Sequence, residues 1–292
     1  MNFLKSTSET QRGIFLLIIA MLFFSLMDAL AKDLSARNSS VMVVWARYAS
    51  QTFWAFLILS PWLVRLLRTR QLKMQLLRSA LLFAATFCFF TSLRYLELAE
   101  ATAIFEVAPL MIIILSVVIL GETVGPHRRI GVAIGLCGAL VIVRPGMGVF
   151  HWAALLPIVA AFFYASYSIA TRFLGRNEPA ATSFLYTALI GTLAASVLVL
   201  PNWQSPAPGD IPIMATFGIL GGIGHLALIA ALRFAPASML APFGYVGLMF
   251  NTIWGYVFFG EVPDLATVVG GLIIVGAGLY VWRRETQISK PA

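Results

Sequence analysis

The amino-acid sequence predicts an all-α membrane protein in which ten transmembrane helices form two inverted five-helix repeats. Hydrophobic residues make up 60% of the 292 positions and charged residues only 11%, whereas a soluble domain carries charge on roughly a quarter of its residues. Apolar runs of about 20 residues recur along the chain, each long enough to cross about 30 Å of hydrocarbon. The two halves also match when the chain is shifted against itself by 139 residues.

Five apolar runs lie in the first half, separated by short gaps rich in Pro, Gly or charge. They predict helices over residues 13–34, 41–63, 76–96, 101–120 and 130–143. Five further runs predict helices over residues 152–174, 181–200, 213–234, 237–260 and 265–282. The gaps are too short for a soluble domain, so we expect two units, residues 1–144 and 145–292, one for each repeat.

The positive charges predict how these helices lie in the membrane. If the N-terminus is cytoplasmic, 15 of the 20 Lys and Arg residues fall on the cytoplasmic side, Arg78 among them. Four fall on the opposite side, and Arg47 lies inside a helix. Cytoplasmic loops carry such an excess of positive charge, so we expect both termini in the cytoplasm, beneath a bacterial-type inner membrane. The net charge of +8 then reflects topology, and we expect no nucleic-acid partner.

Matching residues lie at both ends of each half. Arg37-Asn38 falls on Arg176-Asn177, and Gly121-Glu122 falls on Gly260-Glu261. Because each half holds an odd number of helices, the second half must enter the membrane upside down. Inverted repeats of this kind are a building plan of secondary transporters, in which two similar halves rock about a central site.

Motifs of enzymes are absent from the sequence, which has no H-E-x-x-H, no Walker A and no G-x-S-x-G. The three His residues fall in separate segments without the spacing of metal ligands. Cys88 and Cys137 lie inside apolar runs and frame no disulfide. We therefore expect neither an enzyme nor a bound metal or cofactor, and an intramembrane enzyme or a channel remains a remote alternative.

Several motifs make the chain similar to one known family. Trp45-Ala46-Arg47-Tyr48 places an Arg early in the second helix, Ala108-Pro109 lies in the fourth, and Gly-Glu ends the fourth and the ninth. With two five-helix repeats over nearly the whole chain, the sequence resembles the drug/metabolite transporter superfamily, specifically its EamA-type ten-helix group. It departs from a symmetric pattern at Leu248, which stands where a second Pro would mirror Pro109.

This resemblance implies a central substrate cavity lined by helices one, three, four, six, eight and nine, with helices five and ten peripheral or at a homodimer contact. It does not imply one substrate, because some relatives export amino acids and drugs and others take up cofactors. We favour a secondary active transporter that exports an amino acid or an amphipathic, drug-like solute by alternating access, energised by a proton or solute gradient. The alternative is uptake of a cofactor-like solute such as S-adenosylmethionine or riboflavin.

Ionisable residues inside the predicted helices mark candidate functional positions, because they are costly in lipid. Asp28, Arg47 and Glu106 are each expected roughly 8–9 Å below the outer interface, which favours one charge-compensated cluster. In one interpretation Asp28 or Glu106 binds the substrate or a coupling proton, and Arg47 tunes the pKa of that carboxylate. In the other, which we favour for Arg47, that residue extends to the interface or makes a fixed structural charge pair.

The repeat places aromatic residues opposite these charges. At the shift of 139, Asp28 maps onto Tyr167 and Glu106 onto Tyr245. A site between the halves would hold a polar or cationic head against the carboxylates and a flat body against the two phenol rings. Tyr164 lies one turn before Tyr167 and is expected on the same helix face.

Further candidates are polar and aromatic residues of the second half and two prolines inside predicted helices. His225 stands among glycines in the eighth helix, either as a proton relay or as a hydrogen-bonded core residue. Asn251 and Trp254 lie midway along the ninth helix, where they line the cavity or bond across helices. Pro109 and Pro242 are hinge candidates, because proline breaks helical hydrogen bonding.

Overall fold

The computed structural model describes residues 9–121, 125–143, 152–174, 178–262 and 265–288, and over these ranges the chain is helical without a strand. The first half contains α1 (Glu9–Ser35), α2 (Ser40–Leu59), the 3-10 helix η2 (Ser60–Trp62), α3 (Leu63–Leu66), α4 (Leu72–Ser92), α5 (Leu98–Phe105), α6 (Ala108–Leu120) and α7 (Pro126–Val143). The second half contains η3 (Trp152–Ala154), α8 (Leu155–Leu174), α9 (Ala180–Val199), η5 (Leu200–Asn202), α10 (Asp210–Phe234), α11 (Ala237–Gly244), α12 (Val246–Phe259) and α13 (Leu265–Ile288).

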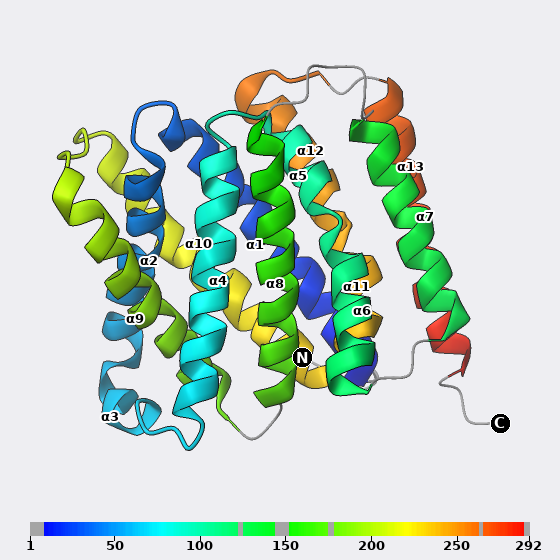
Figure 1. Cartoon of the computed structure of the whole chain (residues 1–292), viewed down its shortest axis with the longest axis horizontal. Helices are drawn as coiled ribbons and strands as arrows, with labels where there is room; N and C mark the ends of the chain where they lie inside the picture. Colours follow the sequence, from blue (N-terminus) through cyan, green and yellow to red (C-terminus); the bar gives the residue numbers. More distant parts are fainter. Residues whose placement is uncertain (1–8, 122–124, 144–151, 175–177, 263–264, 289–292) are drawn as a thin grey trace.

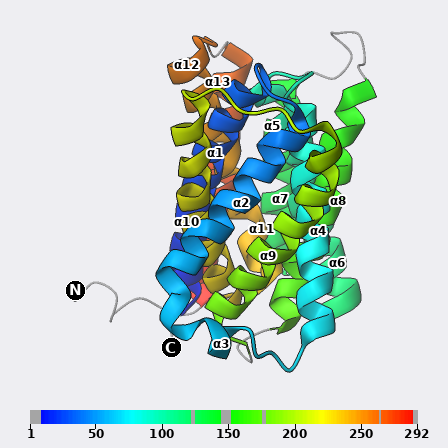
Figure 2. The same cartoon turned by 90° about the vertical axis from the view of Figure 1, so that its left-hand side faces the viewer.

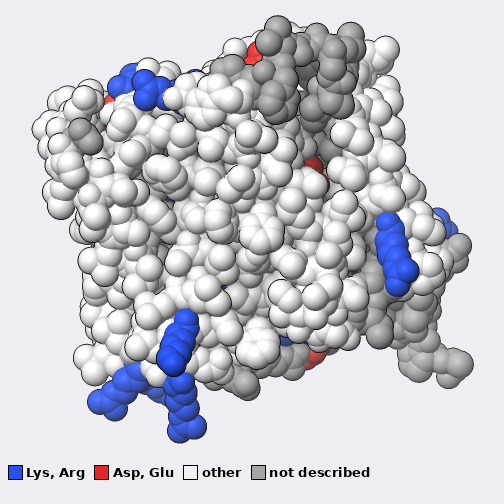
Figure 3. Space-filling view, viewed as in Figure 1, with Lys and Arg blue, Asp and Glu red and all other residues white. Residues whose placement is uncertain are grey.

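The exterior of the bundle is apolar. Six helical stretches of the described residues are long and apolar enough to cross a membrane, namely α1, α4, α5 with α6, η3 with α8, α9 and α10. Large apolar side chains such as Phe53, Val118 and Leu272 point outward. In Figure 3 the Lys and Arg side chains lie at the margins, most of them at the lower left beneath α3, and the centre is almost free of charge. Such a surface is stable in lipid, so this is a multi-pass membrane protein.

Equivalent helices of the two halves share their boundaries. α5 and α11 begin and end 139 residues apart, and α1 and α8 end 139 residues apart. In Figure 1, α1 rises from the lower end of the bundle and α8 descends from the upper end. α6 and α12 both stop at a glycine with positive φ, 64° at Gly121 and 68° at Gly260, a backbone conformation that glycine adopts without steric cost.

The helices of the two halves interleave. α1 packs along α10, α2 against α9 and α4 against α8, while α7 and α13 pack together at one edge (Figures 1 and 2). Small residues permit this close approach, as in many membrane bundles. A Cβ at Gly13 of α1 would lie 2.8 Å from Cβ of Ala235, and one at Gly224 of α10 would lie 2.6 Å from the ring of Phe24.

Two helices that the sequence predicts as continuous, the fourth and the ninth, are each broken in the structure. The fourth forms α5 and α6 with Glu106 between them, and the ninth forms α11 and α12 with Tyr245 between them. Pro109 accounts for the first break, because it lacks the N–H that would bond to the carbonyl of Phe105 and its ring clashes with that carbonyl. The two breaks lie 139 residues apart, at equivalent positions of the repeat.

The contact between α2 and α10 gives a first testable prediction. A Cβ at Gly218 would overlap the backbone carbonyl of Ser50 and lie 2.6 Å from Cδ1 of Trp54. Because a backbone carbonyl in a helix cannot move aside, Gly218→Ala is expected to destabilise the protein by about 1–3 kcal/mol, measured as a lower Tm in detergent. Gly221→Ala on the same helix is the matched control, since its Cβ would meet no atom closer than 3.4 Å. Equal Tm values for both variants would contradict this packing.

Candidate functional site

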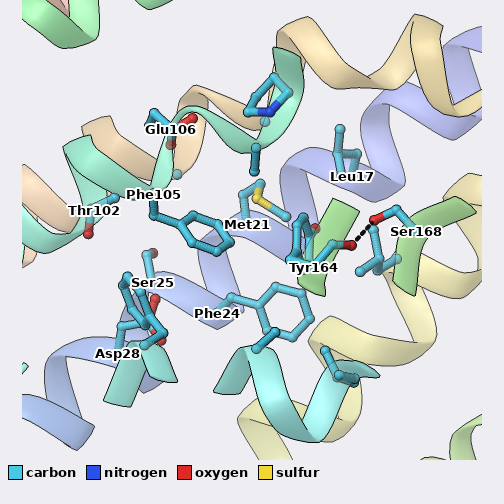
Figure 4. A pocket seen from close by; sticks show the side chains of 18 of the residues that line it. Leu17, Met21, Phe24, Ser25, Asp28, Thr102, Phe105, Glu106, Tyr164 and Ser168 are labelled. Atoms are coloured by element: carbon cyan, nitrogen blue, oxygen red, sulfur yellow. Dashed lines mark hydrogen bonds between the residues drawn. The ribbon is translucent and has the colours of Figure 1, made fainter. Parts of the chain in front are cut away.

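A cavity of about 140 Å³ lies at the centre of the bundle, between the helices of the two halves. It has room for roughly ten water molecules, or for a small organic solute in their place. Its wall is mostly apolar and carries a few polar groups (Figure 4). The lining residues come from α1, α2, α4, α5, α6, α8, α10, α11 and α12. These include the helices that the family resemblance implies, and α2 adds Arg47.

The Glu106 side chain lies in the cavity wall at the break between α5 and α6 (Figure 4). The residue is 4% exposed, and its carboxylate has no hydrogen-bond or ion-pair partner among the described residues. Gly247 of α12 lies opposite, where a Cβ would be 4.0 Å from Oε1 of Glu106. A buried carboxylate without a partner is costly, and a bound cation or a proton would remove that cost.

Asp28 lies in the same wall, on α1, near a polar contact between helices. The side-chain amide of Asn251 lies beside the Asp28 carboxylate and donates a hydrogen bond to Oγ1 of Thr102 at 3.0 Å. Its Oδ1 atom is buried without a partner. Trp254 is absent from the wall and instead donates from Nε1 to Oγ of Ser25 at 3.0 Å. Asp28 is thus held where α1, α5 and α12 meet.

Arg47 lines the cavity but does not form the charge cluster that its predicted depth suggests. The residue is 2% exposed, and Nη1 donates to Oγ1 of Thr86 on α4 at 2.7 Å. In the described part of the chain, no nitrogen of Arg47 lies within 4.0 Å of a carboxylate oxygen of Asp28 or Glu106. Equal depth in the membrane therefore did not produce contact, because the Arg47 side chain bonds to α4 instead of α1 or α5.

His225 of α10 also lies in the wall and is 1% exposed. Its Nδ1–H donates to the carbonyl of Gly221 at 3.0 Å, and the Phe24 ring stands edge-on to it at 4.8 Å between centroids. The other ring nitrogen, Nε2, is buried without a partner. One side of the ring therefore matches a hydrogen-bonded core histidine, and the other side leaves a polar atom for a solute or a water molecule.

The structure places one of the three candidate tyrosines in the wall. Tyr164 of α8 lies against Phe105, with 5.4 Å between ring centroids. Tyr167 is fully buried outside the cavity, and its hydroxyl accepts a hydrogen bond from Nη2 of Arg78 at 2.9 Å. The Tyr245 hydroxyl donates to a backbone carbonyl of α7 at 3.2 Å. The expectation that Tyr167 and Tyr245 line the cavity is therefore not met, since both phenols bond to other helices.

Aromatic residues that the sequence did not single out complete the wall. They stand near the carboxylates, Phe24 one turn before Asp28 and Phe105 next to Glu106, and Phe89 and Phe90 add two more rings from α4. Helical spacing from Asp28 was the signal that would have found Phe24, whereas Phe105 is only the sequence neighbour of Glu106. Of the two hinge candidates, Pro109 lines the cavity. Pro242 belongs to α11, and its side chain lies outside the described residues.

The sequence counted Arg78 with the cytoplasmic charges, and the structure shows its side chain buried inside the bundle. It lies more than one turn inside α4 and is 0% exposed. Nε donates to Thr171 at 3.1 Å, and Nη1 donates to the Ser183 carbonyl at 2.7 Å and to Thr187 at 3.0 Å. With the bond from Nη2 to Tyr167, the guanidinium ties α4 to α8 and α9 just behind the cavity.

Ion pairs join the two halves at the end of the bundle where α1 finishes. Nζ of Lys32 lies 2.6 Å from Oε1 of Glu261, which follows α12. Nη2 of Arg37 lies 2.7 Å from Asp33 and 3.0 Å from Asp210, the first residue of α10. The hydrogen bonds with Asp33 and then Asp210 raise the pKa of Arg37 above its ordinary value, so its charge persists at every physiological pH.

A solute-sized cavity walled by both halves of a membrane-embedded helical bundle defines the class of this protein, a membrane transporter for small molecules. In the part of the chain that the structure describes, no group of three or more His, Cys, Asp or Glu is placed to hold a metal. The chain belongs to the EamA-like transporter family, whose model matches residues 11–144 and again residues 151–283.

Characterised proteins of similar sequence are named as transporters. The pseudopaline exporter CntI of Pseudomonas aeruginosa (strain UCBPP-PA14) is 29% identical, covering 94% of this chain and 96% of its own. A riboflavin transporter of Vibrio cholerae is 30% identical over 96% of this chain and 95% of its own. An S-adenosylmethionine uptake transporter of Rickettsia prowazekii is 26% identical over 94% of this chain and 94% of its own. A crystal structure that is 18% identical has the same fold, with a TM-score of 0.77 over 97% of this chain and 99% of the other.

Proposed function

We propose that this chain is a secondary active transporter that moves a small organic solute across the membrane by alternating access. The observation that carries the proposal is the Glu106 carboxylate, which lies without a partner at a helix break inside a cavity walled by both halves. Asp28, Asn251 and His225 offer further polar contacts, and Tyr164 offers an aromatic face. Such a wall suits a solute with a cationic head and a flat or apolar body.

In this proposal ten spans form two inverted five-helix repeats, and both termini lie in the cytoplasm. Three observations support the arrangement: helix breaks and glycine caps recur 139 residues apart, α1 and α8 run in opposite directions, and the family model matches the chain twice. Two inverted halves that exchange conformations would open one cavity first to one side of the membrane and then to the other.

The two ends of the cavity differ, and the difference supports an inward-facing state. Leu232 and Ala237 line the cavity where α10 ends and α11 begins, so along these two helices it extends to that end of the bundle. That end is cytoplasmic in the proposed topology. At the opposite end the ion pairs of Lys32 and Arg37 join α1 to the second half. We take these pairs as the closure of the outer end.

For the direction of transport we favour export of an amino acid or an amphipathic solute, as in the similar protein named as an exporter. Uptake of a cofactor-like solute is the alternative. The aromatic wall, with Phe24, Phe105 and Tyr164, suits flat rings, and similar proteins are named for riboflavin and S-adenosylmethionine. An exporter should protect cells from an excess of its solute, whereas an uptake carrier should rescue an auxotroph for it.

The proposal is tested with the purified protein and a panel of amino acids, S-adenosylmethionine, riboflavin, nucleosides and organic cations. A ligand at 100 times its Kd stabilises a protein by about 2.7 kcal/mol, so we expect one chemical class to raise the Tm. Members of that class should then cross proteoliposome membranes faster than they cross empty vesicles. Flux equal to that of empty vesicles for the whole panel would contradict the proposal.

The closure of the outer end gives a separate prediction. Lys32→Ala removes the ion pair with Glu261, and the outward-open state should become more populated. A cysteine at Ser25 in the cavity wall, with Cys88 and Cys137 replaced by Ser, should then react severalfold faster with a membrane-impermeant maleimide added to whole cells. Arg94→Ala is the control, because Arg94 is an exposed cation between α4 and α5 at the same end. Unchanged labelling in Lys32→Ala would contradict the assignment of a closed outer end.

A further inference from the structure

Arg47 brings a buried positive charge to the cavity wall without a carboxylate at ion-pair distance. The residue is 2% exposed, its Nη1 bonds to Thr86, and its Nε is buried without a partner. The rings of Tyr48 and Phe90 lie 4.6 and 5.8 Å from Cζ and compensate the charge only weakly. A buried charge without a partner in direct contact is strongly unfavourable, so the guanidinium has room for an anion that would contact it.

Arg78 shows how this fold treats a structural arginine. Its guanidinium donates four hydrogen bonds, and it lies behind the cavity wall without lining it. Arg47 donates one hydrogen bond, to Thr86, and does line the cavity. Both residues are almost fully buried, so burial does not explain the contrast. The unused donors of Arg47 therefore point to a ligand rather than to a structural role.

Asp28 supplies the opposite charge nearby. Arg47 lies near enough to Asp28 to interact with it electrostatically, yet the two side chains are not within the 4.0 Å of an ion pair. A small head group that carries both charges would fit between them and satisfy each one. Guanidinium groups bind carboxylates through two parallel hydrogen bonds, which gives such a contact strength and direction.

We infer that the transported solute is a zwitterion, an amino acid or an amino-acid derivative. Its carboxylate binds the Arg47 guanidinium, its ammonium group binds Asp28, and its side chain lies against the aromatic wall around Phe24 and Phe105 toward Glu106 (Figure 4). This inference rests on the proposed function and names the substrate class of the same cavity. It assigns Arg47 to substrate binding, whereas the sequence alone favoured a structural charge pair.

Three matched probes separate the two charges of the head group. Phenylalanine carries both charges, phenylalaninamide keeps the ammonium group without the carboxylate, and 3-phenylpropionate keeps the carboxylate without the ammonium group. The Kd of each probe is measured from the rise of the Tm with its concentration. Because the three aromatic bodies are identical, differences between the Kd values report on the head group alone. We expect the wild type to bind the zwitterion at least about tenfold more tightly than either analogue. The same comparison is made with methionine, and S-adenosylmethionine is compared with its decarboxylated form.

The variant Arg47→Gln tests which residue reads the carboxylate. We expect its affinity for the zwitterion to fall to that for the amide, while its affinity for the amide stays as in the wild type. A merely structural role would weaken both equally. Arg47→Lys keeps the positive charge without the planar guanidinium, so it should retain part of the preference for the zwitterion over the amide. Arg94→Gln is the control, because that exposed arginine lies outside the wall.

Each outcome bears on one of the two proposals. The inference is overturned if the wild type binds phenylalanine and phenylalaninamide equally, or if it binds no zwitterion, and both results are independent of whether Arg47→Gln folds. It is also overturned if Arg47→Gln still prefers phenylalanine to phenylalaninamide. A wild type that moves riboflavin but binds no zwitterion overturns the inference and leaves the transporter intact. Arg47-dependent binding of a zwitterion that never crosses the vesicle membrane supports the inference and contradicts the proposed function.

Discussion

Glu106→Gln is expected to lower the initial rate of transport about 10- to 100-fold. The reason is that a hydrogen bond between the solute and the charged Glu106 carboxylate would contribute about 1.5–3 kcal/mol to binding. The carboxylate lies buried in the wall of the cavity, has no partner in the described part of the chain, and sits where α5 ends. Glutamine keeps the shape of the side chain and removes the charge. The rate is measured in proteoliposomes with the solute that the thermal panel identifies.

Asp28→Asn should lower the rate in the same way, since Asp28 lies in the same wall. Neither amide can titrate, so a pH dependence of the wild-type rate that arises from a coupling proton should disappear in the variant that lost the proton site. Glu100→Gln is the matched control, because Glu100 is an exposed glutamate on α5. If Asp28→Asn and Glu106→Gln both transport at the wild-type rate and independently of pH, the proposed site is wrong.

Arg78→Leu is expected to destabilise the protein by about 3 kcal/mol or more, because removing one partner of a buried polar network leaves the others unsatisfied. The guanidinium is fully buried, and its loss would leave the Tyr167 hydroxyl, the Thr171 and Thr187 hydroxyls and the Ser183 carbonyl without this donor. The effect is measured as a fall of the Tm in detergent, about 5–10 °C for a protein of this size.

A matched control and a smaller change make this prediction specific. Lys73→Leu removes an exposed cation from the same helix and should leave the Tm almost unchanged. Tyr167→Phe removes only the hydroxyl that accepts from Nη2 of Arg78, so its effect should be smaller, about 1–2 kcal/mol. The two substitutions share a contact, so their effects should not add. An Arg78→Leu variant as stable as Lys73→Leu would refute a structural role for the network.

Much of the architecture was accessible from the sequence because lipid imposes a simple rule. Each span needs about 20 apolar residues and must bond its own backbone, so helix positions follow from hydropathy, and the observed boundaries of α2, α9 and α10 lie within a few residues of those expected. The repeat was also visible in the sequence, because equivalent residues of the two halves recur at one shift of 139 residues. Interruptions of the fourth and ninth helices were expected only as hinges at Pro109 and Pro242, and the breaks at Glu106 and Tyr245 were not, because an apolar run reads as continuous whether or not its hydrogen bonds are interrupted.

The membership of the cavity was predicted in part. Asp28, Glu106, Tyr164, His225 and Asn251 all line it, because an ionisable or polar group in the middle of a span must face a partner or a cavity. Sequence position gives the depth of a side chain, but the rotation of its helix decides which neighbour it meets. Tyr164 and Tyr167 differ by about 60° around α8, and this rotation separates the cavity wall from the contact with Arg78.

The amino-acid pattern alone therefore determined that the chain crosses a membrane repeatedly, that its two halves are alike, and which polar residues lie at the depth of a central site. Only the packing of one half against the other decided which charges have partners. Arg78 is satisfied by the four hydrogen bonds that it donates to α8 and α9, while Arg47, with one bond to α4, faces the cavity. Both are arginines inside a span, and the distinction rests on contacts between residues far apart in the chain, which hydropathy does not encode.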